Sequence, residues 1–132
     1  MRQFILASAL ILTVFLAGCG SSNSGGSNSA TITMGEGQFT GNTAITITPG
    51  GTVTFDDTNG GQHNLVTGTN GSFTAEQGAP GDFVAAGLPF SAGVVKTITF
   101  PTAGVYHITC TFHPSMQATI TVQAAQSSGG GY

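Results

Sequence analysis

Apolar residues alternate with threonine and other polar residues in a series of short segments between residues 30 and 123. The segments that share this pattern are TITM (31–34), AITIT (44–48), TVTF (52–55), KTITF (96–100), VYHITC (105–110) and MQATITV (116–122). Because successive side chains of a β-strand point to opposite faces, the alternation predicts strands with one buried face. Turn sequences such as PGG (49–51) and PTAG (101–104) follow some of them. Many short strands joined by turns predict an all-β chain, folded as an antiparallel β-sandwich.

The composition agrees with a single domain of this kind. The chain has 132 residues, 21 of them glycine, and only 5% are charged. This length is enough for one domain and too short for two. After the first sixteen residues no segment has an apolar stripe of helical period. Residues 67–93 are rich in glycine and proline, and we expect either a turn of helix or an irregular strand there.

The first nineteen residues read MRQFILASALILTVFLAGC and combine Arg2, an apolar run over residues 4–17 and a final cysteine. The run is short for a membrane-spanning helix and has the form of a secretory signal. Its ending, LAGC, resembles a bacterial lipobox. We therefore predict a lipoprotein signal peptide over residues 1–18 and a lipid on Cys19. A plain signal peptide or an uncleaved anchor is the alternative.

The same pattern predicts the domain boundaries. The lipidated cysteine and a flexible Gly/Ser/Asn linker would occupy residues 19–29, the folded domain residues 30–123 and a disordered tail residues 124–132. Removal of the signal peptide would leave Lys96 as the one strong base against five acids, a net charge of −4. Such a charge disfavours nucleic acid as a partner.

The sequence CTFHPSM (110–116) places a thiol, an imidazole and a thioether within seven residues. Lipid on Cys19 would leave Cys110 without a disulfide partner in an oxidising compartment, where a free thiol is a liability unless it is buried or bound. A one-electron copper site uses a thiolate, two imidazoles and a weak thioether. Cys110, His113 and Met116 supply three of these ligands, so a second histidine has to come from elsewhere.

Two further histidines are available. His107 lies three residues before Cys110 in the same predicted strand, so it points to the opposite face and is expected at the surface, with an auxiliary role as the alternative. His63 lies in NGGQHNLV, a glycine-rich turn that opens onto a short strand. We therefore favour His63 as the second imidazole, although a histidine in such a turn is often only a polar surface residue.

The segments GVYHITCTFHPSMQATITV and QHNLV together resemble the cupredoxins, the small blue copper proteins, and their amicyanin- and plastocyanin-like members in particular. The resemblance covers roughly residues 30–123 and implies a Greek-key β-sandwich. It also implies one copper ion that alternates between Cu(I) and Cu(II). His63, Cys110 and His113 would bind this ion in a plane, and Met116 would bind it axially.

The resemblance further implies that Asn64 ties the two ligand segments together. Its side chain would reach Thr111, and its backbone N–H would face the Cys110 sulfur. Phe112 stands where amicyanin and plastocyanin have proline, so it keeps an N–H that could donate a second hydrogen bond to this sulfur and raise the reduction potential. The alternative is that Phe112 only packs. Thr109 replaces an aromatic residue of plant plastocyanins, which leaves the edge of His113 as the expected electron exit.

These features predict an electron carrier and not an enzyme. We expect a monomer tethered by its lipid outside the cytoplasm, in the periplasm or on the outer face of a bacterial cell membrane. It would shuttle single electrons between membrane or soluble redox proteins through an apolar rim around His113, with Pro114, Leu65, Pro89 and Phe90 nearby. The alternatives are an extracytoplasmic copper carrier or store, and a metal-free envelope lipoprotein. Multicopper enzymes need more than three histidines, and a binuclear copper centre needs two cysteines in one loop.

Overall fold

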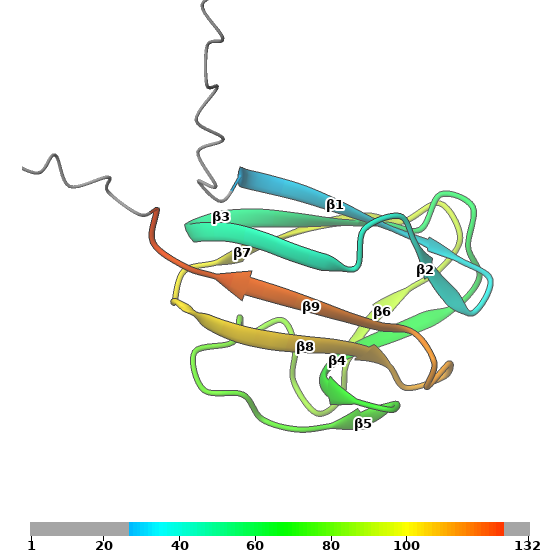
Figure 1. The fold of residues 1–132 in the computed structure, drawn as a ribbon. Coiled ribbons are helices and arrows are strands. Elements are labelled where there is room, and N and C mark those ends of the chain that lie inside the picture. Colours follow the sequence, from blue (N-terminus) through cyan, green and yellow to red (C-terminus); the bar gives the residue numbers. More distant parts are fainter. Residues whose placement is uncertain (1–26, 126–132) are drawn as a thin grey trace, which may run out of the picture.

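The computed structural model describes residues 27–125, which contain nine strands and no helix (Figure 1). The strands are β1 (Ser27–Gly35), β2 (Gln38–Thr40), β3 (Ala44–Asp56), β4 (His63–Thr69), β5 (Ser72–Phe73), β6 (Leu88–Phe90), β7 (Val95–Phe100), β8 (Gly104–Cys110) and β9 (Gln117–Val122). This part of the chain accordingly has no helix that could cross a bilayer. The predicted signal peptide, Cys19 and residues 126–132 of the predicted tail lie outside the described residues.

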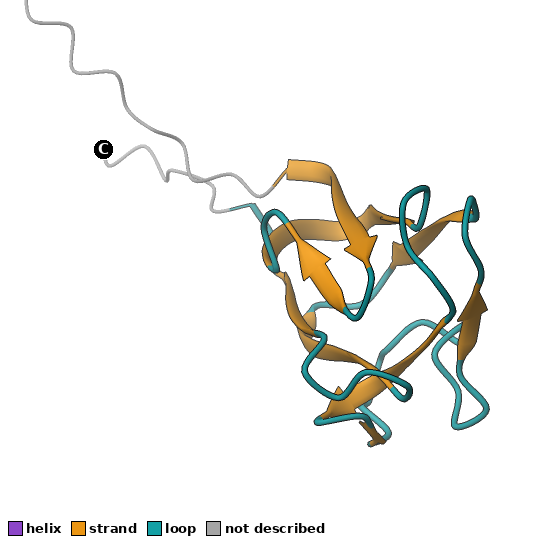
Figure 2. Cartoon of the chain, turned by 90° about the vertical axis from the view of Figure 1, so that its right-hand side faces the viewer, coloured by secondary structure: helices purple, strands orange, loops and turns teal. Residues whose placement is uncertain are grey.

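The strands form two layers that share β3. One layer contains β2, β1, β3 and β7, and the other contains β3, β9, β8, β4 and β5, with β6 on the free edge of β4. Figure 2 views the sandwich from one end, with loops crossing the end that faces the reader. The prediction of an all-β sandwich is confirmed. β1 begins at Ser27, so the last three residues of the predicted linker lie in a strand.

The PGG sequence at 49–51 is a bend within one strand and not a turn between two. Residues 44–47 of β3 pair with β9, whereas residues 51–56 pair with β7. Gly50 has φ 82°, a conformation that other residues rarely adopt, and it bends the strand from one layer to the other. The prediction of two separate strands here was therefore wrong, because glycine can redirect a strand without ending it.

The sandwich is also not purely antiparallel. β1 runs parallel to β3, and β3 runs parallel to β9, while the remaining pairs are antiparallel. Both parallel pairs join strands that are separated by other elements, since β2 lies between β1 and β3 and five strands lie between β3 and β9. Parallel neighbours need such long connections, and alternation within a strand carries no information about them.

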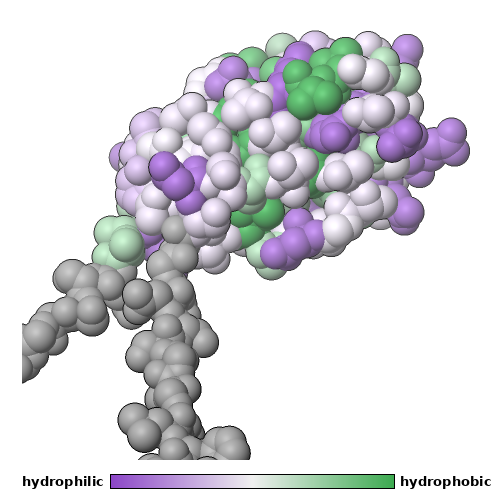
Figure 3. Space-filling view, turned by 90° about the horizontal axis from the view of Figure 1, so that it is seen from above, coloured by the Kyte–Doolittle hydropathy of each residue, from purple (hydrophilic) through white to green (hydrophobic). Residues whose placement is uncertain are grey.

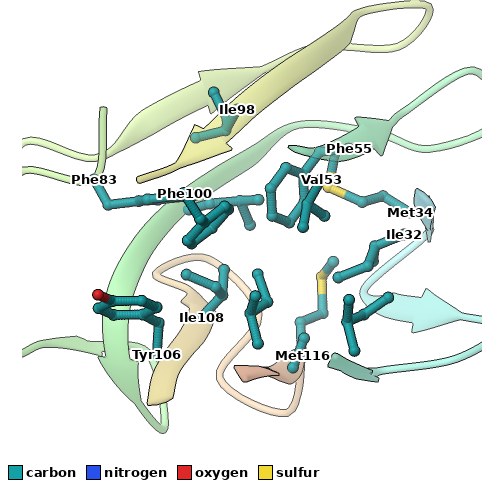
Figure 4. Close-up of a cluster of buried hydrophobic side chains, with 14 of the residues drawn as sticks. Ile32, Met34, Val53, Phe55, Phe83, Ile98, Phe100, Tyr106, Ile108 and Met116 are labelled. Carbon is teal, nitrogen blue, oxygen red and sulfur yellow. The ribbon is translucent and has the colours of Figure 1, made fainter. Parts of the chain in front are cut away.

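The alternating apolar residues fill the space between the layers, as predicted. Figure 4 shows Phe55, Phe100, Tyr106 and Met116 among the side chains of this core cluster. All four are nearly or fully buried. The outer surface is mostly near neutral in hydropathy in the view of Figure 3, as expected for strands whose outward residues are largely threonine.

Strand register places the start of β1 and the end of β9 far from the loop that follows β8. Ser27 pairs with Ile47, Ile47 with Val122, and Val122 with Gly104, the first residue of β8. Cys110 is the last residue of β8 and lies at the opposite end of the sandwich, where Figure 1 shows the β8–β9 loop. The stretch 67–93 contains the end of β4, then β5, β6 and turns, so the irregular-strand alternative was correct there.

Candidate metal centre

The centre lies where β4 begins and β8 ends. His63 is the first residue of β4 and Cys110 the last residue of β8, and the two antiparallel strands pair Leu65 with Cys110. His63 thus lies two residues beyond the paired position, on the same face as Leu65. His113 comes from the loop between β8 and β9. The two segments are far apart in sequence, and strand pairing brings them together.

The three side chains converge on one point. The Cys110 Sγ lies 3.9 Å from His63 Nδ1 and 3.7 Å from His113 Nδ1. Ligand atoms of all three residues lie within 4.8 Å of one another. Bonds of about 2.0 Å to nitrogen and about 2.3 Å to sulfur, as found for the neighbouring ion zinc, separate N and S by about 3.7 Å at 120°. The distances and the mixture of thiol and imidazole therefore fit a trigonal copper site.

The site is buried on one side and open on the other. His63 is 1% exposed and Cys110 is fully buried, whereas His113 is partly exposed. The two imidazole rings are tilted by 59° with centroids 5.1 Å apart. A Cβ added to Gly37 would lie 3.3 Å from the His113 ring, so the turn between β1 and β2 covers one side of that ring. The part of the His113 ring that this turn leaves uncovered accounts for its partial exposure to solvent.

Backbone hydrogen bonds fold the loop after β8 around the site. The Met116 amide donates to the His113 carbonyl over 2.9 Å, and the Cys110 amide donates to the Met116 carbonyl over 3.3 Å. The Thr109 hydroxyl donates to the same Met116 carbonyl over 3.0 Å. Met116 is 1% exposed, and Figure 4 shows its thioether directed into the core. The loop thus holds the methionine side chain inside the protein.

Asn64 connects the two segments, as the sequence predicts. Its side-chain amide donates to the Thr111 hydroxyl and to the Ala86 carbonyl, each over 3.2 Å. The Thr111 amide donates to the Asn64 carbonyl over 2.9 Å. A Cβ on Gly87 would overlap the Asn64 side chain, so only glycine fits there. Hydrogen bonds from the Asn64 and Phe112 amides to the Cys110 sulfur are not among those of the described residues, and they stay predictions.

The apolar rim differs from the expectation. Phe112 is 58% exposed, so its ring does not pack in the core. Leu65 and Phe90, expected at the rim, are 0% and 5% exposed and belong to the core. Both lie at inward positions of their strands, which alternation could have indicated. Pro89, also expected at the rim, is exposed. The exposed apolar residues beside His113 in the sequence are Phe112 and Pro114.

His107 lies at the surface, as predicted, and has a partner that the sequence did not reveal. Its Nδ1 lies 2.8 Å from Glu76 Oε1, and its amide donates to Glu76 Oε2 over 2.8 Å. The His107 side chain is 45% exposed. Glu76 belongs to the stretch between β5 and β6, so this pair fastens that stretch to β8.

Sequence reasoning missed Asp57, a fully buried residue directly after β3. Its Oδ1 lies 3.5 Å from His63 Nε2. Burial raises the pKa of the Asp57 carboxyl, and the neighbouring His63 opposes the rise. Burial also lowers the pKa of His63, while Asp57 acts in the opposite direction. Val53, Phe55 and Asp57 are two residues apart, so strand alternation places all three on the buried face. This spacing could have indicated from the sequence that Asp57 is buried.

These features define a small β-sandwich with a buried thiol and two imidazoles at one end. The family model for copper-binding proteins of the plastocyanin/azurin family matches residues 27–123. The chain therefore belongs to this family, the cupredoxins, whose cofactor is copper and whose members carry electrons. A search of curated proteins found no match.

Solved structures have a similar fold. The amicyanin of Paracoccus versutus is 23% identical, with a TM-score of 0.51, over 72% of this chain and 81% of amicyanin. The Cu(I) form of an amicyanin variant is 20% identical, with a TM-score of 0.54, over 74% of this chain and 84% of the variant. Dithionite-reduced auracyanin from Roseiflexus castenholzii is 25% identical, with a TM-score of 0.52, over 75% of this chain and 99% of auracyanin.

Proposed function

We propose that the protein carries single electrons through one copper ion, which His63, Cys110, His113 and Met116 would hold. The observation that supports this most directly is the approach of two Nδ1 atoms to one thiol sulfur, at 3.9 and 3.7 Å. Bound copper supplies the one-electron chemistry, alternating between Cu(I) and Cu(II).

The protein's contribution is a fixed set of ligands. The buried strand ends hold His63 and Cys110, and the hydrogen bonds of the β8–β9 loop hold His113 and Met116. Asn64 and Thr111 join the two segments that carry these ligands. One fixed arrangement of ligands that both Cu(I) and Cu(II) accept keeps the change in structure small when an electron is transferred. With four side-chain ligands no position remains for a substrate, so the proposal is a carrier and not an enzyme.

Electrons enter and leave through His113. This imidazole is partly exposed, whereas His63 is 1% exposed. The exposed apolar residues Phe112 and Pro114 lie beside His113 in the sequence and offer a surface for membrane-bound or soluble redox proteins. Charged residues are only 5% of the chain, so long-range electrostatic steering of these partners is weak.

The carrier is tethered outside the cytoplasm of a bacterium by lipid on Cys19. The LAGC sequence after a short apolar run supports this part of the proposal. The register that places Ser27 at the end opposite Cys110 is compatible with it, because a tether there leaves the metal end accessible. Two acyl chains make such an anchor stable, and the tether raises the local concentration of membrane partners.

The copper proposal is tested by loading the purified protein with Cu(II). We expect an intense blue band that ascorbate bleaches and reoxidation restores, together with rapid electron self-exchange measured by NMR. Cys110→Ser should abolish the band. Tight Cu(I) binding without a blue band after oxidation would instead support a copper carrier or store and overturn the electron-carrier proposal.

The tether is tested separately by metabolic labelling with a fatty acid that carries an alkyne. We expect the protein to incorporate the label and to sediment with membranes. Cys19→Ser should lose both properties and keep the blue band. Labelling that persists in Cys19→Ser, or no labelling of the parent protein, would overturn this part of the proposal.

A further inference from the structure

Asp57 is an unusual residue for the interior of a protein. Its side chain is fully buried, and neither carboxyl oxygen has a hydrogen-bond partner among the described residues. The polar atom opposite it, His63 Nε2, lies 3.5 Å from Oδ1 and also has no hydrogen-bond partner there. Buried carboxyl groups without partners are costly and rare in folded proteins, so this pair needs an explanation.

The backbone fixes the carboxyl group in this place. The Asp57 amide donates to the Val94 carbonyl over 3.0 Å, and the Asp57 carbonyl accepts the Gly93 amide over 2.9 Å. Gly60 faces the carboxyl group, and a Cβ there would overlap Oδ1 and lie 3.0 Å from His63 Nε2. The chain therefore leaves room for the carboxyl group and directs it toward the imidazole.

We propose that Asp57 is a positioning residue whose carboxylate accepts the Nε2–H of His63 and thereby leaves Nδ1 free to bind copper. A neutral imidazole carries one N–H, so the nitrogen that donates to the carboxylate decides which nitrogen is the ligand. His63 Nδ1 is the atom that faces the Cys110 sulfur, at 3.9 Å. Metal-bound histidines generally donate their second N–H to such an acceptor. The role of Asp57 in copper binding rests on the proposed function. The tautomer of His63 does not, because it can be measured without copper.

A second consequence concerns the two oxidation states. A buried negative charge next to a ligand favours the more positive ion, so Asp57 stabilises Cu(II) relative to Cu(I). A competing acceptor is the Gly35 carbonyl, which also faces the His63 ring. The two acceptors differ in charge, and experiments can separate them.

The first experiment uses the copper-free protein, so that it is independent of redox function. The ¹⁵N shifts of His63 should show Nε2–H and an unprotonated Nδ1 as the main tautomer. Asp57→Asn keeps an acceptor oxygen and should keep this tautomer, whereas Asp57→Leu should give a mixture of tautomers. An unchanged tautomer in Asp57→Leu would assign the role to Gly35 and overturn the proposal.

The second experiment measures the ratio of Cu(I) to Cu(II) at a fixed solution potential. Asp57→Asn should raise this ratio on the order of tenfold or more, because it removes a buried charge. Asp56→Asn is the matched control, since Asp56 is partly exposed and its carboxylate accepts hydrogen bonds from the Thr58 amide and hydroxyl. Equal effects of the two substitutions would overturn the electrostatic part of the proposal.

Urea unfolding of the copper-free variants distinguishes positioning from a structural role. Asparagine keeps an acceptor oxygen for His63 and removes the desolvation cost of a buried charge, so this replacement should leave the stability unchanged or increase it. Asp57→Asn should therefore be at least as stable as the parent protein. A marked loss of stability in this variant would mean that Asp57 serves the fold and would overturn the proposal. Failure to bind copper at all would refute the proposed function and leave the tautomer result intact.

Discussion

Asn64 and Thr111 bind each other through two hydrogen bonds, one between side chains at 3.2 Å and one between backbone groups at 2.9 Å. The first residue follows His63 and the second follows Cys110. A movement of either ligand segment therefore disturbs the other. This pair therefore adds to the pairing of β4 with β8 in joining the segments that carry His63 and Cys110.

Removing the Asn64 side chain should loosen the site. Asn64→Leu loses the bonds to Thr111 and Ala86, and we expect a loss of about 1–3 kcal/mol in the free energy of unfolding. Thr111→Val loses only one of these bonds and should cost about 0.5–1.5 kcal/mol. Urea unfolding of the copper-free protein measures both. Equal costs for the two variants would show that the bond to Ala86 contributes nothing.

Gly87→Ala should displace Asn64 without removing it. The added Cβ overlaps the Asn64 amide, and Gly87 also has φ 82°. Gly41→Ala is a matched control, since Gly41 has the same φ of 82° and nothing within 4 Å of an added Cβ. Gly41→Ala should cost about 1–2 kcal/mol from backbone strain alone. Gly87→Ala should lower the free energy of unfolding by more than Gly41→Ala does, and it should also shift the blue band. Equal losses in the two variants with an unshifted band would contradict the prediction.

Met116→Gln should lower the reduction potential while copper stays bound. An amide oxygen is a harder donor than a thioether and favours Cu(II). Met34→Gln is the control for placing an amide in the core, because Met34 is also fully buried. Voltammetry should show a lower potential in Met116→Gln only. Loss of copper from that variant would mean that the axial contact holds the ion in the site.

Phe112→Pro should lower the potential if the Phe112 amide donates to the Cys110 sulfur. Loss of this donor leaves more electron density on the thiolate, which stabilises Cu(II) over Cu(I). Phe112→Leu keeps the amide and changes only the exposed side chain, so its potential should match that of the parent protein. An unchanged or higher potential in Phe112→Pro would argue against this hydrogen bond.

Tyr106 should make the protein less stable in alkaline solution. Its hydroxyl donates to the Thr102 carbonyl over 2.8 Å, and burial raises its pKa above the usual 10.0. Above pH 10.0 the unfolded chain loses the hydroxyl proton while the folded chain keeps it, so stability falls as the pH rises. Tyr106→Phe should cost about 0.5–1.5 kcal/mol at pH 7 and less above pH 10. A cost that is independent of pH would contradict this.

The alternation of apolar and polar residues predicted much of the fold, because the pattern within a strand indicates which of its faces is buried. It placed β1, β7, β8 and β9 within a few residues, since threonine and apolar residues alternate there without interruption. It could not reveal that β3 bends at Gly50 and joins both layers. Nor could it show that β3 runs parallel to β9, because such pairing depends on the path of the whole chain.

The candidate site was predictable to a similar extent. Cys110, His113 and Met116 lie in one short segment, so their spacing alone indicates a metal loop. His63 lies 47 residues before Cys110, and strand pairing was needed to show that they meet. Asp57 was overlooked because an acid at an inward position runs against the rule that charges face solvent.

The bend at Gly50 has a mechanical consequence. β3 belongs to both layers as one uninterrupted strand, so neither layer can peel away while the other stays intact. Amide hydrogens of Ile45 in one layer and Phe55 in the other should therefore exchange with solvent in the same opening event.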